Sequence, residues 1–283
     1  MFYYFNAEMK YYEKPVPTPK PFATATDAEL ADLLNAYYND LLSWQDLGWA
    51  VGDTRLIHLD AMHAPSPNSS NTWAAQDITV VIVAHDHNDL ATPINGHTKA
   101  ALTVQTREVM NNNQTVSGAI GHIFINGVNE VATTFTKWSN LYMRTYLNNT
   151  VWDAFPSTLK TSIKPSNHYR HTTYNGTESE QVTDNLFLPS YPEIFGTASN
   201  QYYTPASPAE GTQFEYYQTS DNRIKYGNND GSSNELEQHW WTSSTSSTYS
   251  STNKYLWMKV SMSGSAGISA GYNAYALAPA FCM

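Results

Sequence analysis

The segment WWTSSTSSTYSSTNKYLWMKVSMSGSAGISAGYNAYALAPAFCM, residues 240–283, decides the fold. It begins with two adjacent tryptophans and ends on the apolar run Ala278-Pro279-Ala280-Phe281-Cys282-Met283. Chain termini normally fray, so an apolar end without a polar tail predicts a final strand that is tied into a sheet. We expect this strand to close the domain.

Residues 255–263 alternate in the manner of a strand with two different faces. One face carries Leu256, Met258, Val260 and Met262, and the other carries Tyr255, Trp257, Lys259, Ser261 and Ser263. The tight connection Gly264-Ser265-Ala266-Gly267 follows, and residues 269–281 then suit a second strand. The pattern predicts a hairpin with the first face buried and the second displayed.

Exposed aromatic rings beside a cation make a competent binding surface for a glycan or a protein. With the outer positions of the second strand, the candidate ligand-binding residues are Tyr255, Trp257, Lys259, Tyr272, Asn273 and Tyr275. The alternative is that another layer or another subunit covers them. Trp240 and Trp241 face opposite ways on a strand, so at most one could stack on a sugar, and core packing is expected for at least one.

Composition excludes several classes of protein. A net charge of -10 argues against a phosphate-backbone partner, so no nucleic acid is expected. The chain holds no run of eighteen apolar residues, and Asn6, Glu8 and Lys10 stand where a signal peptide needs an apolar stretch. We therefore expect no membrane insertion and no export signal. The single cysteine, Cys282, has no internal disulfide partner, which fits synthesis in a reducing cytoplasm.

The first 48 residues differ from the remainder. Residues 1–25 are rich in aromatic residues and prolines, which favours an extended arm. Thr26 and Glu29 form a capping box, and leucines at helical spacing predict an amphipathic helix over residues 27–46. We assign residues 26–48 to anchoring or oligomerisation. The alternatives are an arm folded back on its own domain and a helix packed on the sheet.

Residues 49–283 read as one α+β domain. Strands are predicted over residues 54–59, 77–84, 101–106 and 119–126, with Asn, Gly and Pro between them. Ser139 is expected to cap a helix that Pro156 ends, and a short second helix follows through Leu159 and Ile163. A short strand at residues 186–188 precedes long loops. The expectation is a mixed β-sheet with two flanking helices.

Several blocks in order resemble a known family. They are Trp138-Ser139, Met143-Arg144, Tyr146-Leu147-Asn148, Pro156-x-x-Leu159-Lys160, Ile163-Lys164, residues 186–190, 193–196, 211–217 and 222–225, Trp240-Trp241 and Ala278–Cys282. The chain resembles a family of uncharacterised domains, found in gut bacteria and in phage structural gene clusters, that looks like a C-type lectin-like fold. The resemblance covers residues 49–283. One departure is that the usual Trp-Trp-x-Arg-Ser-Pro has lost its arginine, because Ser243 stands in its place.

The resemblance implies a role on a virus particle. Phage members carry a short helix before the domain and a segment like Trp49-Ala50-Val51-Gly52-Asp53. We expect a virion protein, made in the bacterial host cytoplasm, that binds other virion proteins through residues 1–48. Homo-oligomers, trimers in particular, are expected for fibre proteins of this kind. Diversification of the surface at residues 261–276, known in related lectin-like proteins, is an open alternative.

Candidate chemistry is sparse. His85-Asp86-His87-Asn88-Asp89 could converge on a metal, but its spacing is not specific, and a loop held by side-chain hydrogen bonds is the preferred interpretation. The Glu-Pro-Asn and Trp-Asn-Asp signatures of calcium-dependent lectins are absent from the C-terminal region. Formylglycine-generating enzymes share a related fold but need a reactive cysteine pair. No phosphate loop or nucleophile elbow is present.

The sequence therefore predicts a non-enzymatic phage virion protein that displays a C-type lectin-like domain and binds a bacterial-surface or mucosal glycan or protein. We expect no catalytic residue, no metal and no cofactor. One alternative is a capsid decoration or head-fibre subunit with a mainly structural role. Another is a glycan-active enzyme, whose carboxylate pair the sequence does not identify.

Overall fold

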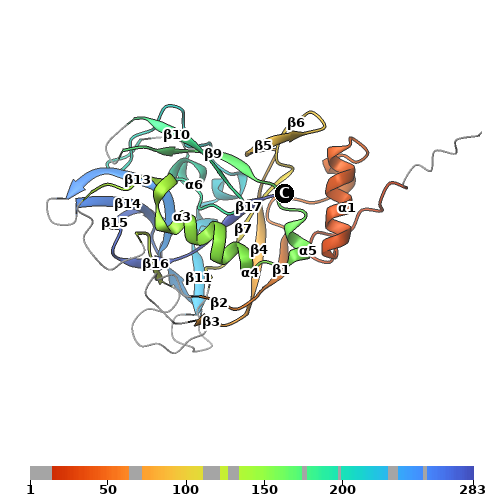
Figure 1. The fold of residues 1–283 in the computed structure, drawn as a ribbon, viewed down its shortest axis with the longest axis horizontal. Coiled ribbons are helices and arrows are strands. Elements are labelled where there is room, and N and C mark those ends of the chain that lie inside the picture. Colours follow the sequence, from red (N-terminus) through yellow and green to blue (C-terminus); the bar gives the residue numbers. More distant parts are fainter. Residues whose placement is uncertain are drawn as a thin grey trace, which may run out of the picture.

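Four antiparallel strands form the sheet at the centre of the molecule. A computed structural model describes residues 15–63, 72–110, 122–126, 134–173, 177–196, 199–228, 235–250 and 254–283. The central sheet has the order β1 (Thr54–Leu59), β4 (Gln76–His85), β7 (Leu102–Thr106) and β17 (Ala280–Cys282). Figure 1 shows it between the first helix and a second, five-stranded sheet.

The last strand, β17, is bonded along both edges. It pairs with β7 on one side, where Phe281 lies opposite Val104. On its other side, Phe187 exchanges two backbone hydrogen bonds with Ala280, and the amide of Lys164 donates to Cys282. All three residues of β17 are fully buried. The prediction that the C-terminus is tied into a sheet is confirmed.

The second sheet carries the residues of the predicted hairpin. Its order is β15 (Ala266–Ala270), β14 (Lys254–Val260), β13 (Trp240–Ser250), β16 (Ala274–Ala276) and β8 (His122–Phe124). Strands β14 and β15 form the predicted hairpin. The expected single strand over residues 269–281 is wrong, because the chain turns after Ala270 and divides into β15, β16 and β17. Met262 lies beyond β14, in the turn, and is exposed rather than buried.

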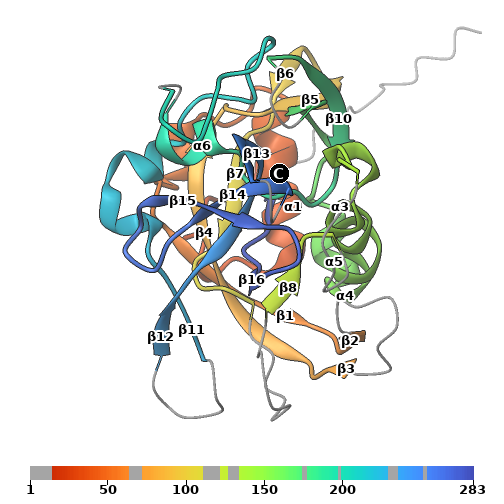
Figure 2. The same cartoon turned by 90° about the vertical axis from the view of Figure 1, so that its left-hand side faces the viewer.

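The other strands of the described residues form three smaller sheets. One has the order β10 (Ser179–Asp184), β9 (Ser166–His171), β5 (Asp89–Ile94) and β6 (His97–Lys99). The two hairpins are β2 (Met62–His63) with β3 (Thr72–Trp73), and β11 (Lys225–Asn228) with β12 (Glu235–Gln238). Figure 2 shows β11 and β12 projecting from the body of the molecule.

The predicted helix over residues 27–46 is interrupted. Helix α1 (Asp27–Tyr38) begins at a capping box of Thr26 and Glu29, as expected. It ends at Asn39, and Asp40 has a positive φ of 55°, a backbone conformation that a helix does not accept. Helix α2 (Trp44–Leu47) starts at a second capping box, formed by Ser43 and Asp46. Leu41, between the two helices, is exposed and not on a buried face.

Helix α1 packs on its own domain. Leu30, Leu33 and Leu34 are almost fully buried in the same core as the central sheet. The segment before it folds back as well, because the ring of Phe22 packs edge-on against Trp49 with centroids 5.7 Å apart. Arg55 of β1 donates to the carbonyl oxygens of Phe22 and Ala25. Residues 1–14 of the predicted arm lie outside the described residues.

A second helical region lies in the chain between β8 and β9, which belong to two different sheets. It consists of η1 (Trp138–Asn140), α3 (Tyr142–Tyr146), the π-helix η2 (Leu147–Val151), α4 (Trp152–Ala154) and α5 (Ser157–Lys160). Leu141, not Ser139, is the N-cap of α3, because Ser139 lies inside the preceding 3₁₀ turn. Pro156 follows the end of α4, as predicted.

Short helices fill the remaining loops. They are α6 (Tyr191–Phe195), η3 (Glu215–Gln218) and η4 (Ser220–Arg223). The architecture is therefore mixed α and β, built mostly from sheets with few helices, as the sequence predicts. Among the described residues, no helix is long and apolar enough to cross a membrane.

Candidate functional site

The structure brings three of the predicted ligand-binding residues together. The Lys259 amine lies 4.0 Å from the centre of the Tyr275 ring, and Asn273 donates to the Ser269 hydroxyl at 2.7 Å. That same hydroxyl group contacts the Tyr275 hydroxyl at 3.1 Å. Each polar group of this cluster is thus engaged by a neighbour on β14, β15 or β16. Lys259, Asn273 and Tyr275 are half-buried, and their contacts are made within this sheet.

Trp257 does not lie on a displayed face. Only 1% of its surface is exposed, because Phe135 stacks on it at 6.2 Å and Trp138 packs against it at 6.4 Å. Tyr255 contacts Phe135 as well, at 5.7 Å, and is half-buried. Tyr272 is also half-buried. The expected exposure of Trp257 is wrong, since Phe135 and Trp138 cover its ring.

The tryptophan pair belongs to the core. Trp240 and Trp241 are both fully buried. The indole N–H of Trp240 donates to the carbonyl of Arg223 at 3.0 Å, and Trp241 meets the Tyr275 ring edge-on at 4.9 Å. The prediction that at least one of them packs in the core is confirmed, and neither presents a stacking face.

The segment His85–Asp89 forms separate structural contacts. Asp86 accepts from Tyr37 and Trp44, both at 2.8 Å, and His87 lies 3.1 Å from the carbonyl oxygen of Thr212. Asn88 donates to Glu193 at 3.2 Å. These partners hold the loop by side-chain hydrogen bonds, as the preferred interpretation stated. Within the described ranges, no group of three or more His, Cys, Asp and Glu side chains is placed to hold a metal.

A buried ionic cluster lies under helix α6. Glu193 completes the capping box of that helix, and its carboxylate lies 3.5 Å from the Arg170 guanidinium. Glu210 accepts from the Ser244 hydroxyl at 2.6 Å and lies 3.1 Å from His171. These five side chains are at most 4% exposed. The cluster is therefore scaffold, because a substrate has no access to it.

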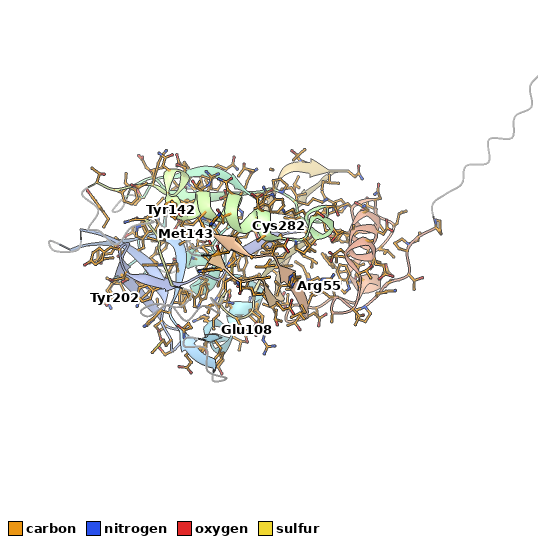
Figure 3. All side chains as sticks on the ribbon, turned by 60° about the horizontal axis from the view of Figure 1, so that its bottom comes forward. Arg55, Glu108, Tyr142, Met143, Tyr202 and Cys282 are labelled. Carbon is orange, nitrogen blue, oxygen red and sulfur yellow. The ribbon has the colours of Figure 1, made fainter. Side chains whose placement is uncertain are left out.

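An open cleft of about 390 Å³ lies elsewhere, beside the hairpin of β11 and β12. We call it the tyrosine cleft. It is lined by Arg107, Glu108, Tyr216, Asp221, Asn222, Ile224 and Tyr226. Figure 3 labels Glu108 beside the light-blue ribbon of this hairpin. None of these residues was among the candidates that the sequence suggested.

Backbone pairing fixes the two walls of the tyrosine cleft. The amide of Arg107 donates to the carbonyl of Thr79 at 2.8 Å, and the amide of Val109 donates to the carbonyl of Tyr226 at 3.0 Å. On the other wall, the Asn222 side chain donates to the Tyr216 carbonyl at 2.7 Å. The cleft is therefore held by the end of β7, the two 3₁₀ turns and β11.

Lys225, on β11, joins the two walls of the tyrosine cleft. Its buried amine donates to the carbonyl oxygens of Thr106 and Arg107, at 2.5 and 3.1 Å. The same amine lies 5.2 Å from the centre of the Trp240 ring. Burial lowers the pKa of Lys225 to about 7. A residue of β11 thus clamps the wall that carries Glu108 onto the wall that carries Tyr226.

The tyrosine cleft presents aromatic rings and charges together. Tyr226 is 41% exposed and Tyr216 is half-buried. Burial raises the pKa of Tyr216, while the charge of Arg107 opposes this shift and that of Glu108 adds to it, so both charges act on its hydroxyl. Rings supply apolar contact area, and the Arg, Glu, Asp and Asn side chains supply donors and acceptors. A concave site with this mixture suits a ligand that is apolar on one face and polar at its edge.

The sequence carried a partial signal for this cleft. Tyr216 and Asn222 lie in two of the blocks that resemble a known family, but nothing linked those blocks to Arg107 and Glu108, more than a hundred positions earlier. The bond from Val109 to Tyr226 and those from Lys225 to Thr106 and Arg107 bring the two segments together.

Comparison with known proteins gives one family. Residues 122–283 match the family described as Domain of unknown function (DUF6273). No curated protein and no solved structure matches the chain. The matched residues include the second sheet and one wall of the tyrosine cleft, whereas Arg107 and Glu108 precede them.

Proposed function

The chain belongs to the DUF6273 family of domains of unknown function, and we propose that it is a non-enzymatic binding module that holds a saccharide in the tyrosine cleft. The observation that carries this proposal is the exposed ring of Tyr226 in a cleft with Arg107, Glu108, Asp221 and Asn222. A sugar ring has an apolar C–H face that packs on an aromatic ring and hydroxyl groups that need hydrogen bonds at its edge.

The setting that we propose is a phage particle. The chain resembles, through its sequence blocks, lectin-like domains of phage structural proteins, and a displayed C-type lectin-like domain would bind a bacterial-surface or mucosal glycan. One face of helix α1 packs in its own domain, and attachment to other virion proteins, or to copies of the same chain in a trimer, is proposed to use the remaining surface of residues 1–48. The mainly structural alternative, a capsid decoration or head-fibre subunit, would instead cover the cleft.

A glycan array tests the binding proposal. The wild-type protein is expected to bind a subset of saccharides, and Tyr226→Ala is expected to weaken that binding at least tenfold, because it removes the exposed ring. Tyr255→Ala is the matched comparison, since it removes a half-buried tyrosine at the surface that the sequence first suggested. Leu56→Ala controls for loss of an exposed apolar side chain on β1.

Two outcomes of the array would contradict the proposal. One is the absence of binding to any saccharide by the wild-type protein, and the other is binding that Tyr255→Ala abolishes and Tyr226→Ala leaves unchanged.

A cryo-EM map tests the proposed place on a phage particle. In a particle that carries the protein, the tyrosine cleft is expected to face solvent. A cleft buried between subunits would favour the structural alternative.

A further inference from the structure

A second cleft, of about 480 Å³, lies between helix α3 and the end of β10. We call it the arginine cleft. Its lining residues are Arg144, Thr145, Asn148, Asn149, Pro165, Thr183, Asp184 and Asn185. It shares no residue with the tyrosine cleft. None of these eight described residues is aromatic, so a ligand here is held by hydrogen bonds and charge rather than by stacking.

The π-helix η2 shapes one wall of the arginine cleft. Asn148, on that helix, donates to Asp184 at 3.1 Å and to the Leu186 carbonyl at 2.9 Å, and accepts from the Asn185 amide at 2.8 Å. These bonds fix the facing loop at residues 184–186. π-Helical turns are rare and occur frequently at functional sites. Asn149, on the same turn, is exposed and lines the cleft beside the anchored Asn148.

Arg144 is held in one orientation by three acceptors. Its Nε donates to Asp184 at 2.7 Å, its Nη1 to the Ser139 carbonyl at 3.1 Å and its Nη2 to the Thr183 carbonyl at 2.9 Å. A guanidinium has five N–H groups, so one on each terminal nitrogen remains. Among the described residues, none accepts a hydrogen bond from these two groups. The side chain is 26% exposed and lines the cleft.

Asp184 lies beneath the guanidinium and is nearly inaccessible. Its side chain is 1% exposed. Burial raises the pKa of Asp184, and the charge of Arg144 opposes that shift. Thr145 and Asn149 are exposed at the rim, and Asn185 is half-buried. The cleft thus offers a fixed guanidinium, which is ion-paired with Asp184 on one side, and neutral donors and acceptors around it.

We propose that the arginine cleft binds an acidic sugar, with the sugar carboxylate on the two remaining N–H groups of Arg144 and the sugar hydroxyls on Thr145, Asn149 and Asn185. Guanidinium and carboxylate match in a planar, two-point geometry, and such charged hydrogen bonds are about twice as strong as neutral ones. A fixed guanidinium loses little conformational freedom on binding. A neutral sugar lacks the carboxylate that the Arg144 guanidinium would bind.

Calorimetric titration of the full chain tests the proposal. The probes are glucuronate, galacturonate and N-acetylneuraminate, with glucose and galactose as neutral matches and acetate as a carboxylate without a sugar ring. At least one acidic sugar is expected to bind ten times or more tightly than its neutral match and than acetate. Equal affinity for acidic and neutral sugars, or no binding of the three acidic sugars, would overturn the proposal. Binding of acetate as tight as that of the sugars would reduce the site to a simple anion site and also overturn it.

Variants locate the binding. Arg144→Lys keeps the charge but loses the two-point geometry, and is expected to weaken acidic-sugar binding at least tenfold. Because that change also disturbs Asp184, Thr145→Trp provides a second test, since it fills the cleft from an exposed rim position. Tyr226→Ala, in the other cleft, is expected to leave acidic-sugar binding intact. Unchanged binding by Thr145→Trp, or loss of it in Tyr226→Ala, would show that the ligand does not occupy the arginine cleft.

Discussion

The hydroxyl group of Tyr38, at the end of helix α1, donates a hydrogen bond of 2.9 Å to the main-chain oxygen of Met283. It also accepts a 2.8 Å hydrogen bond from the amide of Ala101, which precedes β7. The first helix, the central sheet and the last strand therefore meet at one buried oxygen atom. This contact explains why residues 27–38 and 280–283 share a single core.

Tyr38→Phe is expected to destabilise the fold by about 1–3 kcal/mol, because it leaves the buried amide of Ala101 without its acceptor and removes one of the two donors to the Met283 oxygen, the other being the amide of Leu102. Urea unfolding followed by fluorescence measures the change. Tyr142→Phe is the control, since Tyr142 is half-buried and its hydroxyl forms no hydrogen bond to a described residue. If both variants lose the same small amount, Tyr38 does not join the helix to the last strand.

Trp257→Ala is expected to lower the free energy of unfolding by about 3–5 kcal/mol, because it leaves a cavity between Phe135 and Trp138. The same unfolding measurement checks this value, and Lys259→Ala, on the same strand, is expected to cost much less. A folded, fully stable Trp257→Ala protein would mean that this ring is free after all.

The pair of Glu210 and His171 makes stability depend on pH. His171 Nε2 lies 3.1 Å from the Thr204 carbonyl, which only accepts, and Nδ1 lies 3.1 Å from Glu210, so the ring carries both protons. Burial alone would lower the pKa of His171, but Glu210 raises it above its usual value. Burial alone would raise the pKa of Glu210, but His171 and its other partners lower it.

The contribution of Glu210 and His171 to the free energy of unfolding is therefore expected to be greatest between about pH 4.5 and 6.5. The raised pKa of His171 stabilises the fold fully below 6.5, its unfolded value, and this effect is lost as the pH rises through the folded value. The lowered pKa of Glu210 acts above 4.5 and is lost as the pH falls through its folded value. Urea midpoints of wild type and Glu210→Gln across pH 3–9 should differ most inside that window, and a constant difference would contradict the pairing.

Burial of Lys225 makes the fold more stable as the pH rises above 7. Burial lowers its pKa from 10.5 to about 7, so between these values the unfolded chain binds a proton that the folded chain does not. Stability is therefore expected to rise from pH 7 to pH 10 by at most about 1.4 kcal/mol per pH unit. The slope should be shallower in Lys225→Met, measured by urea unfolding at pH 7, 8 and 9. Parallel slopes in the two proteins would show that the amine is not buried.

Local patterns in the sequence predicted the strands well. Residues 54–59 form β1 as expected, because Ile57 and Leu59 alternate with exposed His58 along an edge strand. The apolar C-terminus could be assigned to a sheet for the same reason, since burial of so many adjacent apolar residues requires bonded neighbours on both sides. The capping box of Thr26 and Glu29 placed the start of α1 correctly.

Contacts between residues far apart in the sequence could not be predicted. The alternation of side chains along residues 255–263 predicted which face of the strand carries Trp257. It did not predict which residue covers that ring, because Phe135 is more than a hundred residues away in sequence. The tyrosine cleft was missed for the same reason, since its walls are joined by the bond from Val109 to Tyr226 and by Lys225. The break in the first predicted helix depended on the single backbone conformation of Asp40.

The most direct test of the central claim is a crystal structure of the protein soaked with the saccharide that binds best on the array. We expect a sugar ring packed on Tyr226, with its hydroxyl groups bonded to side chains among Arg107, Glu108, Asp221 and Asn222. An empty tyrosine cleft, with the sugar bound instead against Lys259 and Tyr275, would contradict it.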